Sequence, residues 1–259
     1  TGVCRDYAGQ PVAAPQKARP TETGNPKGLP DAEMGDSWTV FLHGYNVNAQ
    51  RARGWQAEVF KRLYAMGSRT RFVGVTWYGD TGVRIGGTSL DYHMAVFNAL
   101  QTGDQLKKAL GFLDPAKTTV MAHSLGNMVA CQAIQKTGLT PRRYLMLNAA
   151  VPTEAFAKVE ANEAGNMVER EWRGKGGTYA AEYFAANWHK CFAASDPRFQ
   201  LKWSDLFGRI SKEGFTINCY SEGDDIVRCP DRIDGISILQ QAWEGGFAAW
   251  KSQELLKGL

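Results

Sequence analysis

A serine flanked by small residues is the first feature of this sequence that could do chemistry. Ser124 lies in the segment Ala122-His123-Ser124-Leu125-Gly126, after the β-branched and apolar run 118–121 and before a helix-like pattern. A strand that turns sharply into a helix and holds a hydroxyl at the apex is a nucleophile elbow. Such a turn crowds its neighbouring backbone, so small residues at 122 and 126 suit it. The pattern predicts that Ser124 is a nucleophile.

Catalysis by a serine also needs donors for the oxyanion of the tetrahedral intermediate. The backbone N–H of Leu125, directly after the serine, is one candidate. The other is the backbone N–H of Tyr45, because His43-Gly44-Tyr45-Asn46 follows the strand-like run 38–42. An early strand end is where such folds place their second donor. His43 and His123 are expected to shape their turns rather than to transfer protons.

The acid that would orient a catalytic base should follow a later strand. The acidic turn 221–227 comes directly after the strand-like run 215–220 and contains two neighbouring aspartates. Its spacing selects Asp224 as the acid, with Asp225 as the alternative. The competing interpretation is an acidic turn that is simply solvated.

Strands and helices alternate along most of the chain. The expected strands lie at 38–42, 71–77, 118–123, 143–147 and 215–220. The expected helices lie at about 49–66, 91–112, 125–137 and 236–250, and the glycine-rich segment 78–89 is expected to be a loop. This alternation predicts the α/β class, with a mostly parallel sheet and helices on both faces. The carboxyl ends of the strands, where such sheets bind ligands, should bring together His43, Trp77, Ser124 and Asn148.

The domain organisation follows from composition and connection lengths. Residues 1–37 are rich in proline, glycine and small polar residues, so we expect an N-terminal extended leader or linker. Residues 38–259 should form one domain with an insertion at about 152–214, which is longer than a usual connection. The insertion is strongly aromatic. It is either a lid with an apolar wall for an acyl or aryl group, or a pair of helices that covers the sheet.

Composition argues against several classes of function. The chain has 259 residues, 44% of them hydrophobic and 22% charged, with a formal net charge of +4. Basic residues are spread evenly, so nucleic-acid binding is not expected, and no apolar run approaches the roughly 18 residues of a membrane span. The five cysteines have no metal-ligand spacing. Cys219 and Cys229 could pair, although free thiols are favoured, and the compartment stays open.

Together these residues resemble the alpha/beta-hydrolase superfamily over about residues 38–258. The HGYN sequence at 43–46 and the elbow Ala122-His123-Ser124-Leu125-Gly126-Asn127 are similar to a bacterial esterase- or lipase-like branch with an HGYN or HGFN signature and an AHSMGN or AHSLGN elbow. The resemblance implies a serine, acid and histidine triad in that chain order, an acyl-serine intermediate and no metal or organic cofactor. The resemblance does not fix a substrate. We expect a small-molecule ester, with an amide or a thioester as alternatives, and the aromatic insertion weakly favours an apolar acyl or aryl group.

The triad histidine has no obvious position in this sequence. The resemblance places it after the acid and the last strand, but the four histidines are at positions 43, 93, 123 and 189. The simplest hypothesis puts the last strand and its histidine beyond Leu259. An alternative places His189 of the insertion over Ser124, with Glu154 as the acid.

Two other functions stay open on the same residues. A hydrolase-like domain without its base would be a catalytically silent module that binds a ligand or a partner. Cofactor-free lyase or dioxygenase chemistry would use the same elbow. A carboxylic ester hydrolase is the function that the sequence favours.

Overall fold

The computed structural model describes residues 34–80, 84–85, 88–89, 92–156, 158, 193–212 and 214–221. Within this part, the chain forms two compact units. The first extends to Ala150 and includes the strand that ends at Cys219. The second contains the described residues from Val151 to Lys212, together with Tyr220 and Ser221.

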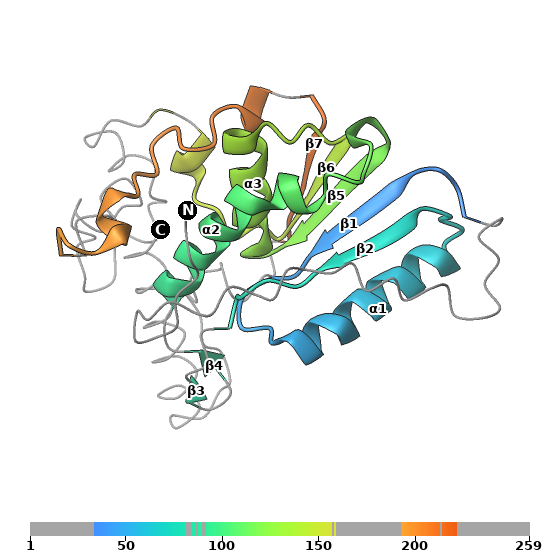
Figure 1. Ribbon diagram of the computed structural model, residues 1–259, viewed down its shortest axis with the longest axis horizontal. Helices are drawn as coiled ribbons and strands as arrows, with labels where there is room; N and C mark the ends of the chain where they lie inside the picture. Colours follow the sequence, from blue (N-terminus) through green and yellow to red (C-terminus); the bar gives the residue numbers. More distant parts are fainter. Residues whose placement is uncertain are drawn as a thin grey trace. The chain divides into compact units, whose positions relative to one another are not determined.

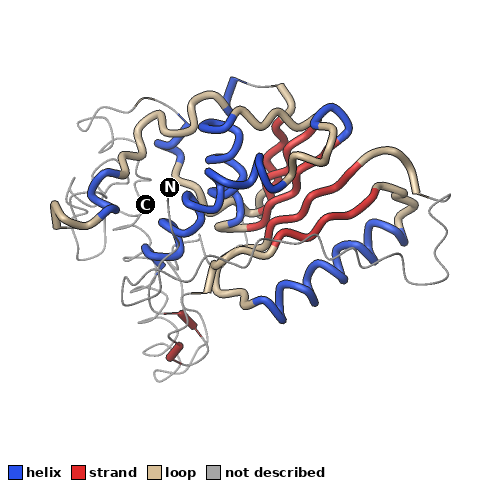
Figure 2. The backbone as a smooth tube through the Cα atoms, in the orientation of Figure 1, coloured by secondary structure: helices blue, strands red, loops and turns tan. Residues whose placement is uncertain are grey.

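The first unit is built on a parallel sheet of five strands in the order β2-β1-β5-β6-β7 (Figures 1 and 2). The strands are β1 (Trp38–Leu42), β2 (Arg71–Val75), β5 (Thr118–His123), β6 (Arg143–Leu147) and β7 (Thr216–Cys219). The helices between them are α1 (Ala49–Ala65), α2 (Tyr92–Ala109) and α3 (Gly126–Thr137). This is the architecture that the alternating sequence pattern predicted.

The strand order reverses direction beside β1. The chain passes from β1 through α1 to β2 on one side, and then returns through α2 to β5 on the other side of β1. Right-handed crossovers therefore put α1 on one face and α2 and α3 on the opposite face, as Figure 1 shows. The carboxyl ends of β1 and β5 flank this reversal, which is where open α/β sheets bind their ligands.

The two faces of the sheet are packed to different extents. Val40 and Leu42 of β1 are aligned with Val120 and Ala122 of β5, and all four are fully buried on the face that carries α3. Strand β5 alternates between buried and partly exposed residues, so its other face is less completely covered. On that face, the ring of Phe72 contacts Phe60 of α1, with 5.8 Å between the centroids.

Local sequence signals account for the ends of the helices. The side chain of Asn48 accepts a hydrogen bond from the Arg51 N–H at 2.9 Å and caps α1. Helix α3 ends at Gly138, whose φ of 69° lies in the left-handed region that glycine adopts without strain. These ends agree with the predicted helices to within one residue for α1 and α3.

One local prediction was wrong. The segment 78–89 was expected to be a loop, but Arg84–Ile85 (β3) and Thr88–Ser89 (β4) pair as antiparallel strands. Two glycines at 86 and 87 lie between them in the sequence. A two-residue Gly-Gly connection is a known hairpin signal, so the information was present in the sequence.

The second unit has a small aromatic core of its own. Its described elements are the 3-10 helices η3 (Thr153–Phe156), η7 (Pro197–Gln200) and η8 (Ile210–Lys212), while η2 (Pro115–Lys117) belongs to the first unit. Trp203 and Phe207 are fully buried, and the ring of Phe207 lies 6.3 Å from that of Phe156. These aromatic residues of the predicted insertion therefore pack into a core. The helix expected at 236–250 lies outside the described residues.

Candidate active site

The backbone of Ser124 adopts an uncommon conformation at the end of β5. Its φ is 51°, in the left-handed region that non-glycine residues rarely enter. Its N–H continues the sheet by donating to the Leu147 carbonyl at 3.0 Å, and helix α3 begins two residues later. Ser124 itself is partly exposed. A strained residue between a strand and a helix is the geometry in which an elbow presents its hydroxyl.

The turn that follows β1 lies directly against Ser124. A Cβ atom on Gly44 would lie 2.9 Å from the Ser124 Cβ, and one on Gly126 would lie 2.5 Å from the His43 carbonyl oxygen. Both distances are shorter than real contacts of this kind. The two turns can therefore approach this closely only because positions 44 and 126 carry no side chain.

His43 is committed to the structure of its own turn. It is fully buried, its Nε2 accepts from the Trp77 N–H at 3.2 Å, and its Nδ1 donates to the Gly44 carbonyl at 2.9 Å. The Trp77 indole stacks on the imidazole and donates to the His43 carbonyl at 2.7 Å. Burial lowers the pKa of His43, so the neutral ring is favoured. These contacts fit the expected shaping role of His43.

The Leu125 N–H is available at the start of α3. Leu125 is the N-cap residue, and among the described residues no acceptor is found for its N–H. A helix N-terminus favours negative charge because its first N–H groups lack partners within the helix. Tyr45, the other predicted donor, follows Gly44 and is partly exposed. The structure therefore brings the segments of Ser124, Leu125 and Tyr45 together at one edge.

An aromatic side chain lies on the α1 side of this edge. Trp55 is 46% exposed, which is unusual for a tryptophan, and its ring centroid lies 5.2 Å from that of His123. His123 immediately precedes Ser124 and is itself partly exposed. Apolar surface is therefore available close to the serine.

A buried polar pair beneath the Ser124 turn was not singled out from the sequence. Asn127 and Tyr144 are both fully buried, and the Tyr144 hydroxyl donates to the Asn127 Oδ1 at 2.9 Å. The Asn127 Nδ2 donates to the carbonyls of Ala122 and Ser124 at 3.0 and 2.9 Å. An asparagine in the first turn of an apolar helix was the signal that could have revealed this pair, because buried polar groups require partners.

The predicted acid and base lie outside the described residues. This applies to Asp224, to its alternative Asp225 and to His189, while Glu154 falls within η3. Strand β7 runs parallel to β6, and the Asn148 N–H donates to the Cys219 carbonyl at 2.8 Å. The chain therefore leaves β7 at the same edge as Ser124, two strands away, or about 10 Å. Cys219 is an exposed free thiol.

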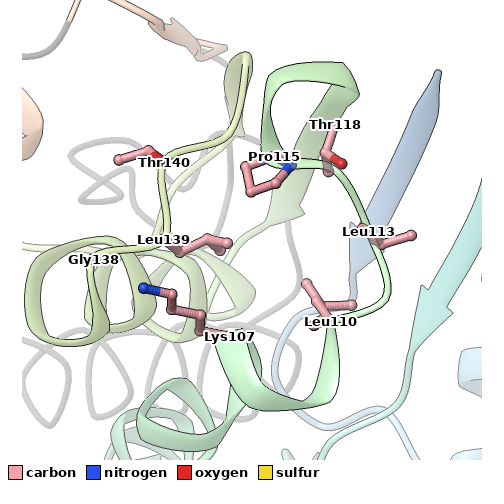
Figure 3. A pocket seen from close by; sticks show the side chains of 9 residues that line it. Lys107, Leu110, Leu113, Pro115, Thr118, Gly138, Leu139 and Thr140 are labelled. Atoms are coloured by element: carbon pink, nitrogen blue, oxygen red, sulfur yellow. The ribbon is translucent and has the colours of Figure 1, made fainter.

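A pocket of about 280 Å³ lies elsewhere in the first unit (Figure 3). Its lining includes Leu110, Pro115 and Leu139, together with Thr118 at the start of β5. It is therefore at the amino edge of the sheet, whereas parallel sheets bind ligands at the carboxyl edge. We do not assign it to the candidate active site.

The described residues contain no group of three or more histidine, cysteine, aspartate or glutamate side chains arranged to hold a metal ion. Among the same residues, no helix combines the length and the apolar character that crossing a membrane requires.

The parallel five-stranded sheet with helices on both faces fits the alpha/beta-hydrolase fold. A family described as "Alpha/beta hydrolase of unknown function (DUF900)" matches residues 30–158. The matched region extends from before β1 to beyond β6 and contains both turns of the candidate site. These findings support the alpha/beta-hydrolase superfamily and, more generally, a hydrolase.

Solved structures with some similarity include an alpha/beta-hydrolase and an esterase. An extracellular alpha/beta-hydrolase from a Paenibacillus species is 16% identical over 52% of this chain and 48% of its own, with a TM-score of 0.31. The Francisella virulence factor BioJ is 18% identical over 53% and 45%, with a TM-score of 0.30. A bacterial heroin esterase is 15% identical over 79% and 50%, with a TM-score of 0.28.

The aligned part of this chain spans about half the length of these solved structures. At such low identity and TM-score, the likenesses carry no information about its activity or substrate. No curated protein matches the sequence.

Proposed function

We propose that the protein is a serine hydrolase that cleaves carboxylic esters through an acyl intermediate on Ser124. The observation that carries the proposal is the left-handed backbone of Ser124, held against the glycine turn that follows β1. A strained residue of this kind requires support from its surroundings, and such residues cluster at active sites.

In the proposed reaction, the Ser124 hydroxyl loses its proton to a histidine base and attacks the ester carbonyl. The Leu125 N–H and the Tyr45 N–H stabilise the oxyanion, and one such donor is typically worth about 3 kcal/mol of transition-state stabilisation. The alcohol then leaves with the proton from the base. Water hydrolyses the acyl-serine and regenerates the hydroxyl.

Asp224 is the proposed acid. The chain leaves β7 at the carboxyl edge of the sheet, and Asp224 follows five residues after Cys219. A short connection of this length is compatible with a carboxylate on the same edge as Ser124. For the base, the family pattern expects a histidine after the acid, and His189 is the alternative within this sequence.

The substrate is proposed to be a small ester with an apolar acyl or aryl group. The partly exposed Trp55 supports this choice, because its ring stands beside His123 and offers apolar surface near the nucleophile.

A fluorophosphonate probe tests the nucleophile directly. The full-length protein should be labelled covalently, and Ser124→Ala should abolish the labelling. Ser68→Ala is a matched control, because it removes a hydroxyl that hydrogen-bonds to Thr70 in another turn. It should be labelled like the wild type. An unlabelled full-length protein would contradict the proposal and favour a catalytically silent binding module.

A further inference from the structure

The Asn127 side chain hydrogen-bonds to the backbone of the turn on both sides of His123. Its Nδ2 donates to the Ala122 carbonyl at 3.0 Å and to the Ser124 carbonyl at 2.9 Å. Both carbonyls can only accept, so the amide must present its nitrogen to them and its oxygen to the Tyr144 hydroxyl. The partners of these three hydrogen bonds therefore determine the orientation of the Asn127 amide.

The Ser124 carbonyl oxygen is fixed by three donors. Besides Nδ2 of Asn127, it accepts the backbone N–H groups of Asn127 at 3.0 Å and of Ala150 at 3.2 Å. The peptide group that joins Ser124 to Leu125 is planar and trans, so its N–H points away from its C=O. Whatever fixes the Ser124 carbonyl therefore also sets the direction of the Leu125 N–H.

We propose that Asn127 is a positioning residue that aims the Leu125 N–H at the oxyanion by holding the Ser124–Leu125 peptide in place. This inference rests on the proposed function of Ser124 and adds a further residue to that site. Asn127 does not touch the substrate. It acts through the backbone of the turn, whose left-handed Ser124 would otherwise relax toward a less strained conformation.

The groups that support Asn127 do not change their protonation near neutral pH. Burial raises the pKa of Tyr144 well above its usual value and that of the Cys131 thiol to about 12. The Cys131 sulfur lies 3.4 Å from the Tyr144 oxygen. Both groups stay protonated, so the Tyr144 hydroxyl remains a donor to Asn127 across the range in which the enzyme would be assayed.

The substitution Asn127→Asp tests the proposal with almost no change in shape. An ionised carboxylate would face two carbonyl oxygens and repel both, whereas a protonated one could donate to one of them. We expect kcat on p-nitrophenyl acetate to fall about 10- to 100-fold at pH 8. This is less than the roughly 10²- to 10³-fold loss on removing an oxyanion donor outright, because the Leu125 N–H would be misaimed but still present. KM should change by less than about threefold, because the ground state does not use the oxyanion donor fully.

The pH dependence separates positioning from simple destabilisation. The ratio of Asn127→Asp to wild-type kcat should rise as the pH falls towards 5, because the carboxyl regains a proton. Gln132→Glu is the matched control: Gln132 lies on the same helix, is buried, and donates to Asp104 at 2.8 Å, away from the elbow. It should destabilise the protein without lowering kcat. Equal kcat losses in the two variants would overturn the proposal.

A structural measurement keeps this test separate from that of the proposed function. Amide hydrogen exchange of Leu125 should change in Asn127→Asp and stay unchanged in Gln132→Glu. If Asn127→Asp fails to fold, Asn127→Ser is the substitute, because it keeps one donor. Its kcat should lie between that of the wild type and that expected for Asn127→Asp. A wild-type protein that lacks esterase activity would contradict the proposed function, and unchanged Leu125 exchange would independently contradict the positioning role.

Discussion

The two faces of strand β5 differ in how completely they are packed. On the face that carries α3, Val120 and Ala122 are fully buried, whereas Met121 and His123 on the α1 face are partly exposed. The closed face holds the Asn127 amide, which donates to the Ser124 carbonyl, and the open face holds Trp55. The backbone of the candidate site thus rests on a fully buried layer, while partly exposed side chains lie on the other face.

The largest predicted difference between the faces is in the loss of unfolding free energy at two neighbouring residues of β6. Met146→Ala on the closed face should lower the free energy of unfolding by about 2–5 kcal/mol, because it leaves a cavity among buried side chains. Leu147→Ala on the open face should cost about half as much, since Leu147 is already partly exposed. Urea denaturation of both variants measures the difference. Equal losses would mean that the faces are equally packed.

A methyl group at Gly126 should break the contact between the two turns. Its Cβ would meet the His43 and Leu42 carbonyl oxygens at 2.5 and 2.8 Å, and overpacking against backbone costs about 1–3 kcal/mol. Gly126→Ala should therefore lower both the unfolding free energy and Ser124 labelling.

The matched control for that change is Gly54→Ala in α1. Nothing lies within 4 Å of the added Cβ, and alanine favours a helix interior over glycine by about 1 kcal/mol. Thermal unfolding should show a small increase in Tm for this variant. A loss of stability as large as that of Gly126→Ala would contradict the steric explanation.

The buried His43 should make the free energy of unfolding fall at acidic pH. Its pKa is lowered in the folded protein, so the unfolded chain binds a proton more readily and stability is lost as the pH falls below about 6.5. The loss per titrating group is at most about 1.4 kcal/mol for each pH unit. His43→Gln should be less stable at pH 8, with a shallower decline between pH 7 and 5. An unchanged slope in urea titrations would argue against this assignment.

The smallest effect on stability is expected on the open face. Trp55→Ala should change the unfolding free energy little, because nearly half of the side chain is already exposed. If Trp55 contacts the substrate, kcat/KM for phenyl esters should fall about 2- to 10-fold, the value of one aromatic contact. Ethyl acetate turnover is the control and should be nearly unchanged. Equal losses on both esters would remove Trp55 from the substrate site.

The sequence was sufficient to predict the elements that hold the candidate site. Strands 38–42 and 143–147 were predicted with the bounds that the structure has, because β-branched and apolar runs bounded by turn residues give a strong local signal. The approach of the Gly44 turn to Ser124 could be anticipated because carboxyl ends of parallel strands meet at one edge.

Other features depend on contacts that no local pattern reveals. An asparagine in an apolar helix indicates that a partner is needed, but only the structure shows that the partner of Asn127 is Tyr144, 17 positions further on. The tautomer of His43 is likewise set by Trp77, 34 positions away. Tertiary hydrogen bonds of this kind leave no period in the sequence, so they cannot be predicted from a single chain.

The close crossing of the Gly44 and Gly126 turns also affects how the protein reaches its working state. These turns are about 80 positions apart in the chain, and both intervening crossovers must be complete before they meet. The loop that closes between them is long, so this contact is entropically costly to form early. If Ser124 is the nucleophile, as proposed, chains in which the two turns have not yet met would carry an unreactive serine, and covalent labelling of Ser124 would report that this contact has formed.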